Sequence, residues 1–210
     1  MKPIRTLFAL LMLFLLTVTA CAAPSPAAPS PAPVAPTQAP AVNEPAASAE
    51  PADSSAAGRP SFGTFTAPGL DGEEYTQELF ANADLTMVNI WGTFCGPCIE
   101  EMPYLGELSA EYADKGFQIV GVVVDAVSRL GGYDKGIVSA AEDIVAQTGA
   151  AYTHLLPSPD LINIKLNQVQ YIPETIFVDK NGGIVGEPIV GGKTKEDWKA
   201  TIDAYLALVQ

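Results

Sequence analysis

Cysteine, histidine and basic residues are all scarce in this 210-residue sequence, which holds three cysteines and one histidine. Three cysteines are too few for a framework of several disulfides or for a zinc site with four thiolate ligands. The 11 lysines and arginines stand against 24 aspartates and glutamates, so the formal net charge is −13. Such an acidic chain is unsuited to binding nucleic acid or an anionic membrane surface, and its charge is typical of a secreted domain that stays soluble.

A run of apolar residues long enough to span a bilayer comfortably is also missing. The run Leu7–Val18 follows a positively charged start and has the length of a signal core, so residues 1–20 are predicted to be an export signal. The next segment, Val18-Thr19-Ala20-Cys21, resembles a bacterial lipobox, whose cysteine receives a diacylglyceryl group that anchors the protein stably. An ordinary cleaved signal, in which Cys21 is incidental, is the alternative.

Proline, alanine and serine dominate residues 22–60. A segment of this composition cannot bury apolar surface, so residues 21–60, which begin at the lipidated cysteine, are predicted to be a disordered and partly extended tether. Residues 61–210 have the length of one domain of ordinary size, and they hold 8 basic and 21 acidic side chains. The acidity therefore belongs to the predicted domain itself.

The part of the sequence that carries chemistry is a strand, a turn and a helix in direct succession. Leu85–Ile90 is mostly apolar and partly β-branched, as expected of a buried central strand, and Trp91–Phe94 makes the turn. Pro97 suits the first turn of a helix, where its missing N–H costs nothing. Cys95 is therefore predicted at a helix N-terminus, where backbone N–H groups and the helix dipole favour the reactive thiolate. Cys98 lies about one helical turn further on, within reach of a disulfide.

This stretch resembles the active-site segment of the thioredoxin superfamily, and Cys95-Gly96-Pro97-Cys98 matches the thioredoxin motif. Asn89 stands where cytosolic thioredoxins carry a buried aspartate, and Glu101 belongs to the pattern Cys-x-x-Cys-x-x-Glu-x-Pro. Both features resemble the TlpA/ResA-like thiol-disulfide oxidoreductases, which are membrane-anchored and extracytoplasmic. Phe94 departs mildly from the family, because it replaces the tryptophan usual before the first cysteine. The resemblance covers about residues 61–210.

The resemblance implies that Cys95 is the nucleophile that attacks a substrate disulfide and that Cys98 resolves the mixed disulfide. This redox-active pair is expected to act with no other cofactor and no metal ion. Glu101 lies three residues after Cys98 on the same side of the helix, and the matching glutamate of the family modulates cysteine ionisation. As a partly buried carboxylate it is expected to favour the protonated thiol and to relay a proton. An inert stapling disulfide and a solvated Glu101 are the alternatives.

Residues from two distant segments are expected to form the substrate-binding surface. In the family, a proline with a cis peptide bond precedes the third strand of the sheet and packs against the cysteine pair, and the matching residue is Pro173. The backbone of Ile172 is then expected to pair with an extended substrate chain. The expected substrate-binding residues are Trp91, Gly96, Pro97, Ile172 and Pro173, with Trp91 packed beside the cysteine pair or within the core.

Three polar residues outside the cysteine motif have more modest expected roles. Asn89 has no charge and is expected to be a hydrogen-bonded strand residue. His154, the only histidine, is expected to be a polar residue at the edge of the sheet. A copper site with Cys95 and Cys98 is its alternative role, although copper-delivery relatives space their cysteines one residue wider. Asp125, at a strand end, is expected to be an ordinary loop acid, and a place in the site is its alternative role.

Periodicity and turn residues predict parallel strands joined by a helix, followed by a hairpin and a closing helix, which together give a three-layer α/β/α sandwich. The family resemblance adds a thioredoxin-like topology with an N-terminal β-hairpin extension. The predicted strands are 62–66, a return strand from 75, 85–90, 117–124, 153–156, 174–178 and 184–190, and the predicted helices are 77–81, 98–114, 137–147, 160–166 and one capped at Thr194.

With the resemblance, these features predict a lipid-anchored thiol-disulfide oxidoreductase on the extracytoplasmic face of a bacterial membrane, which reduces protein disulfides. The resemblance implies protein disulfide clients, apocytochrome c among the plausible ones, and a membrane electron donor of the thiol-transferring type. A monomer that binds no nucleic acid is expected. A disulfide oxidase or isomerase of the same fold, a peroxidase and a copper-binding metallochaperone are the alternatives.

Overall fold

The structure is a computed structural model that describes residues 59–210. The predicted export signal over residues 1–20, the lipidated Cys21 and the tether as far as residue 58 lie outside the described residues and stay predictions. Within residues 59–210, no helix combines the length and the apolar character needed to cross a membrane.

The last two residues assigned to the tether contact the domain. Arg59 Nη1 pairs with Asp179 Oδ2 at 2.9 Å, and both side chains are almost fully buried. The Pro60 carbonyl accepts a hydrogen bond from Ile184 N over 2.7 Å. Arg59 and Pro60 therefore contact the domain, which composition alone did not reveal.

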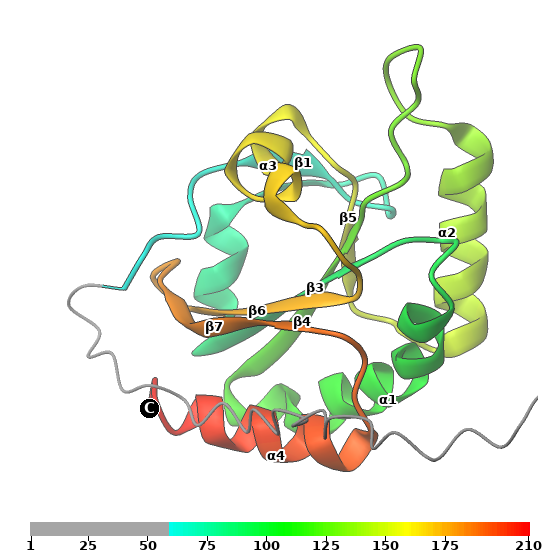
Figure 1. The fold of residues 1–210 in the computed structure, drawn as a ribbon. Helices are drawn as coiled ribbons and strands as arrows, with labels where there is room; N and C mark the ends of the chain where they lie inside the picture. The colour runs from blue at the N-terminus through cyan, green and yellow to red at the C-terminus, as the bar shows by residue number, and fades with distance from the viewer. Residues whose placement is uncertain (1–58) are drawn as a thin grey trace, which may run out of the picture. The chain divides into compact units, whose positions relative to one another are not determined.

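Five strands form the central sheet in the order β5-β4-β3-β6-β7 (Figure 1). β3 pairs in parallel with β4 and antiparallel with β6, which places it at the centre. Every residue of β3 is buried, as its sequence predicts. The strands are β3 (Leu85–Trp91), β4 (Phe117–Val123), β5 (Thr153–Leu155), β6 (Glu174–Asp179) and β7 (Ile184–Val190), and a separate hairpin pairs β1 (Thr66–Pro68) with β2 (Glu74–Thr76).

Helices cover both faces of the sheet, so the predicted three-layer sandwich is confirmed. One face carries α1 and α4, and the other carries α3 with the β1–β2 hairpin (Figure 1). Ser158 and Thr194 cap α3 and α4 through their side chains, and the cap at Thr194 is the one predicted. The helices are α1 (Gly96–Tyr112), α2 (Lys135–Thr148), α3 (Pro159–Ile164) and α4 (Lys195–Leu206), with short 3-10 helices η1 (Gln77–Asn82), η2 (Ala113–Lys115) and η3 (Leu166–Gln168).

The predicted strand over residues 62–66 is wrong, because the first strand is β1 at Thr66–Pro68. Gly63 adopts a positive φ of 104°, which interrupts an extended chain. Phe62 and Phe65 are consequently both buried, and they meet Phe80 edge to face with ring centroids 5.2 and 6.0 Å away. The apparent alternation of this segment therefore reflects two core aromatic residues in an irregular chain.

Candidate active site

Cys95 is the residue at which α1 begins, and Cys98 lies in the first turn of this helix. The two sulfur atoms form a disulfide. The Cys95 side chain caps the helix, since the backbone N–H of Cys98 donates to Cys95 Sγ over 3.3 Å. Cys95 retains 6% exposure, whereas Cys98 has none, so Cys95 is the more exposed residue of the pair. The predicted position of Cys95 at a helix N-terminus is confirmed.

A second loop, Tyr171–Pro173, lies against the turn that carries the disulfide. The peptide bond between Ile172 and Pro173 is cis, as the family resemblance implies. Ile172 packs against the cluster that contains both cysteines, and its Cδ1 would be 3.2 Å from a Cβ placed on Gly92. Gly96 and Pro97 form the exposed start of α1. Residues from two distant segments therefore meet around the disulfide.

Trp91 and His154 lie in the interior next to the cysteine pair. Trp91 is fully buried in the same cluster as the cysteines, so it packs beside the pair from within the core. Trp91 Nε1 donates to His154 Nδ1 over 3.1 Å, and His154 Nε2 donates to the Ala150 carbonyl over 3.0 Å. His154 lies on the edge strand β5 as expected, but it is 4% exposed and belongs to the core.

The environment of His154 does not suit a metal ligand. Burial lowers the pKa of His154 to about 4, which keeps the ring neutral. Both ring nitrogens are already used, one as acceptor and one as donor, so no lone pair remains for copper. Across residues 59–210, no group of three or more histidine, cysteine, aspartate or glutamate side chains is placed to hold a metal ion.

Asp125, expected to be an ordinary loop acid, fixes the turn that leads to the disulfide. Its Oδ1 accepts from the backbone N–H of Thr93 over 3.1 Å, and its Oδ2 accepts from the Thr93 hydroxyl over 2.5 Å. The two residues follow neighbouring parallel strands, β4 and β3, whose carboxyl ends lie at one edge of the sheet. In the sequence, this contact was indicated only by the presence of a polar residue after each of two adjacent strands.

Glu101 is 2% exposed and accepts hydrogen bonds from three donors. Its Oε2 accepts from Trp198 Nε1 over 2.9 Å and from the backbone N–H of Lys193 over 3.2 Å, and its Oε1 accepts from Asn89 Nδ2 over 3.1 Å. Burial raises the pKa of Glu101, and the three hydrogen bonds oppose this shift. The neighbouring Glu100 is exposed, as expected. Glu101 is therefore the buried carboxylate that the sequence predicts.

The donors to Glu101 come from parts of the chain that sequence reasoning did not connect. Trp198 lies in α4, nearly a hundred residues after Glu101 in the chain. Asn89 is confirmed as a hydrogen-bonded strand residue, because its Nδ2 also donates to Thr175 Oγ1 over 3.3 Å. Asn89 Oδ1, however, has no hydrogen-bond partner among the residues that the structure describes. Only a tertiary structure could bring these groups together on one carboxylate.

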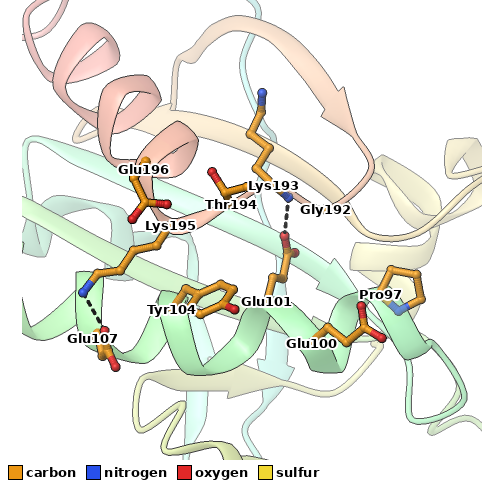
Figure 2. Close-up of a pocket in the computed structure, with 10 residues that line it drawn as sticks. All are labelled: Pro97, Glu100, Glu101, Tyr104, Glu107, Gly192, Lys193, Thr194, Lys195 and Glu196. Atoms are coloured by element: carbon orange, nitrogen blue, oxygen red, sulfur yellow. Dashed lines mark hydrogen bonds and ion pairs between the residues drawn. The ribbon is translucent and has the colours of Figure 1, made fainter.

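A pocket of about 600 Å³, here called the charged pocket, opens between α1 and the segment that leads from β7 into α4. Figure 2 shows the Glu101 side chain rising from α1 toward Gly192 and Lys193. Six of the ten residues that line the charged pocket are charged, and they are Glu100, Glu101, Glu107, Lys193, Lys195 and Glu196. The pocket therefore gives the buried carboxylate a polar route to the surface.

The geometry of the cysteine pair can be compared with known proteins at this point. A family model described as Redoxin matches residues 41–205. The chain belongs to the Redoxin family. The match includes the disulfide, the cis-proline loop and Glu101, so the predicted place in the thioredoxin superfamily, in its ResA-like branch, is confirmed.

Curated relatives named thiol-disulfide oxidoreductase ResA are similar to this chain. The relative from Bacillus thuringiensis (strain Al Hakam) is 33% identical over 119 residues, which cover 57% of this chain and 60% of the relative. The relative from Geobacillus thermodenitrificans (strain NG80-2) is 31% identical over 140 residues, which cover 67% of this chain and 73% of the relative. The chain thus spans about three fifths of the length of the first relatives it matches.

Solved structures share the fold. A thiol:disulfide interchange protein from Chlorobium tepidum TLS has a TM-score of 0.59 at 22% identity, with 70% of this chain and 97% of that chain covered. A secreted disulfide oxidoreductase of Mycobacterium tuberculosis has a TM-score of 0.51 at 20% identity, with 67% and 95% covered. Both likenesses support the thioredoxin-like architecture.

Proposed function

We propose that this chain is a thiol-disulfide oxidoreductase that reduces protein disulfides. One observation carries the proposal: Cys95 caps α1 and is the accessible sulfur, while Cys98 is bonded to it from the buried first turn. A helix N-terminus stabilises a thiolate, and the thiolate is the form that exchanges with disulfides. The names of the ResA relatives support the same activity.

The reaction begins from the reduced dithiol. The Cys95 thiolate attacks one sulfur of the client disulfide, forms a mixed disulfide and releases the other client sulfur as a thiolate. Cys98 then attacks Cys95 Sγ, which closes the Cys95–Cys98 disulfide and releases the second client sulfur. Two electrons pass to the client, and the two protons of the dithiol end on the released client thiols. No cofactor beyond the cysteine pair takes part.

Glu101 serves in this proposal as the group that handles the proton of the cysteine pair. A buried carboxylate with a raised pKa holds a proton more readily than a solvated one, so it can exchange a proton with a thiol, and its negative charge disfavours a nearby thiolate. The charged pocket connects this carboxylate with solvent. Trp198, Asn89 and the Lys193 backbone are positioning groups, because they hold the carboxylate in place.

The proposal includes export and a lipid anchor at Cys21. The apolar run Leu7–Val18 and the lipobox-like residues that follow it support this location, and a secreted oxidoreductase shares the fold. Residues 22–58, rich in proline and alanine, are proposed to tether a monomeric domain outside the cell membrane. Because no soluble thiol pool is expected there, the oxidised pair is reduced by a membrane protein that transfers electrons through thiols.

The main alternative is that the cysteine pair acts as an oxidant or isomerase of protein disulfides. Equilibration with glutathione redox buffers separates the directions, since thioredoxin has a potential of about −270 mV and a strong oxidant about −120 mV. The expected value lies close to that of thioredoxin because Gly96 and Pro97 match its motif. A value near that of the oxidant would reverse the proposed direction while keeping the activity class.

The activity itself is tested with insulin as the protein disulfide and dithiothreitol as the electron source. The wild type is expected to accelerate insulin reduction, and both Cys95→Ala and Cys98→Ala are expected to lose the acceleration. Cys98→Ala should also accumulate client proteins as mixed disulfides on Cys95, which mass spectrometry identifies, whereas Cys95→Ala should not. A wild type that reduces insulin no faster than dithiothreitol alone would contradict the proposal.

A further inference from the structure

Lys165 and Glu174 form an ion pair that is largely withdrawn from solvent. Lys165 Nζ lies 2.5 Å from Glu174 Oε1, and the two side chains retain only 14% and 7% exposure. Glu174 Oε1 has no well-aligned hydrogen-bond donor among residues 59–210, so the close approach of the Lys165 ammonium is what compensates its burial. A buried charge without a partner is strongly unfavourable, and Glu174 therefore depends on Lys165.

The two residues stand at the two ends of the loop that contains the cis-proline. Lys165 follows α3 directly and Glu174 begins β6, and between them the chain forms only the short helix η3 before it reaches Pro173. Figure 1 shows this segment running from α3 to the start of β6. Ile172, which packs against the cluster that contains both cysteines, lies two residues before Glu174. The ion pair therefore closes a loop that reaches the disulfide.

The sheet fixes one end of this loop and leaves the other end to side-chain contacts. Glu174 pairs with Ile90 of β3 and with Val190 of β7, so its backbone has a strand neighbour on each side. The chain between Lys165 and β6 belongs to no strand, and it meets the sheet through the apolar packing of its own residues. The Lys165 side chain adds a charged link between this part of the loop and the fixed end at Glu174.

We propose that Lys165 is a positioning residue, which through its ion pair with Glu174 holds the backbone of Ile172 where a client chain meets it. The inference rests on the proposed disulfide reductase function, in which this backbone pairs with an extended client, and it names the residues that keep the backbone in place. A shift of about 1 Å in a positioned group can lower a rate about a hundredfold. A substrate that offers only a disulfide and no peptide chain does not need the loop.

The test compares insulin with bis(2-hydroxyethyl) disulfide, a small disulfide that has no peptide backbone. The reduced protein is mixed with an excess of either substrate, and closure of the Cys95–Cys98 disulfide is followed by acid quenching and mass spectrometry. In each reaction the dithiol passes two electrons and its two protons to the substrate disulfide, whose two sulfurs leave as thiols. The measured quantity is the second-order rate constant for insulin divided by that for the small disulfide. Partial unfolding lowers both rate constants together, so a merely structural role of Lys165 would leave this ratio unchanged.

Lys165→Met is expected to lower the ratio about tenfold, because the loop is no longer held in the position that an extended client requires. Lys165→Arg keeps a cation at this position and is expected to restore most of the ratio. Lys180→Met is the matched control, since Lys180 follows β6 at its other end and pairs with Asp84 over 3.1 Å in a largely exposed ion pair. Its ratio is expected to equal that of the wild type.

Glu174→Gln and the double variant Lys165→Met/Glu174→Gln complete a double-mutant cycle. Each single change leaves the other charge buried without its partner, whereas the double variant removes both charges and so provides the measurement if a single variant does not fold. The double variant is expected to show the same tenfold loss of the ratio as either single variant, because the two residues act as a unit. A double variant with the ratio of the wild type, or losses that multiply, would overturn the proposal.

The remaining outcomes separate this inference from the proposed function. A wild type that oxidises its dithiol with neither insulin nor the small disulfide would refute the reductase function itself. A wild type that reacts with both, together with a Lys165→Met variant of unchanged ratio, would overturn the positioning role while the reductase function stands. Rate constants that fall by the same factor for both substrates would assign the ion pair to overall stability and would also overturn the proposal.

Discussion

The two cavities beside the disulfide differ in every property that decides what they can bind. The charged pocket is formed by α1 and the segment before α4, and its lining includes the carboxylate of the buried Glu101. A second cavity of about 560 Å³, here called the apolar groove, is formed by the loops after β4 and α3, and it presents uncharged walls with exposed Phe94 and Tyr171. The disulfide turn separates them, because Phe94 lines one and Pro97 lines the other.

This contrast indicates that the molecule divides two tasks between the two faces of its sheet. On the charged side, protein groups surround a single carboxylate, which we propose sets the protonation of the cysteine pair. On the apolar side, no charged residue lines the cavity, so this side is suited to contact with an apolar surface. Changes on the charged side should therefore alter pH dependence, whereas changes on the apolar side should alter client preference.

The largest effect on stability is expected from replacing Trp198, which donates a hydrogen bond to Glu101 on the charged side. Trp198→Ala deletes a fully buried indole and one donor to Glu101, so the free energy of unfolding should fall by about 3–5 kcal/mol. Trp198→Phe retains most of the packing and loses only the donor, and should cost about 1–2 kcal/mol. Urea unfolding measures both. Equal losses in the two variants would show that the hydrogen bond to Glu101, and not the packing, dominates.

Glu101 should make stability depend on pH in a defined direction. Burial raises its pKa in the folded protein, so its stabilising contribution is complete below its ordinary pKa and is lost as the pH rises through the folded pKa. Relative to Glu101→Gln, the wild type should therefore lose about 1.4 kcal/mol per unit by which the pKa is raised. Urea unfolding of both proteins between about pH 4 and pH 8 tests this. A wild type that gains stability over Glu101→Gln with rising pH would contradict it.

The same carboxylate should also govern thiol ionisation. Glu101→Gln removes a negative charge that opposes thiolate formation, so the midpoint of the alkylation rate against pH should move down by about half to one unit. Glu100→Gln is the matched control, because this neighbour on α1 is exposed and solvated. Iodoacetamide labelling of the reduced protein gives the profiles. An unchanged midpoint in Glu101→Gln would show that Glu101 does not influence thiol ionisation.

The smallest effect is expected next to the apolar groove. Thr93→Val removes the hydroxyl that donates to Asp125 while the backbone N–H of residue 93 still reaches the carboxylate, so stability should fall by about 0.5–1.5 kcal/mol. The alkylation midpoint should remain that of the wild type, because the Glu101 system is untouched. A midpoint shift comparable to that of Glu101→Gln would show that thiol ionisation does not depend on the charged side alone.

The parts of the fold that follow local chemistry were predictable from the sequence. The strand and helix around Cys95 have their apolar run, their proline and their capping sulfur within a few residues, and the hairpin after β6 has its Asn-Gly turn. The structure of the segment with Phe62 and Phe65 was not predictable in this way, because these aromatic residues pack against Phe80, which lies in a different element.

Within the site, the reacting residues were predictable and their supports were not. Cys95, Cys98 and Pro173 carry signatures in short motifs. The donors to Glu101 and the Asp125–Thr93 contact join residues that are far apart in the chain and share no motif. Long-range hydrogen bonds of this kind depend on register and packing, which a single sequence does not encode locally.

The position of Cys95 at the start of α1 is tested most directly by alkylating the two thiols of the reduced protein over a range of pH and locating each modification by mass spectrometry. The helix cap and the exposure of Cys95 predict that it is modified first and that its pKa lies below both that of Cys98 and the ordinary thiol value of about 8.5. Faster modification of Cys98, or a Cys95 thiol that ionises no more easily than that of an unfolded peptide, would contradict the account.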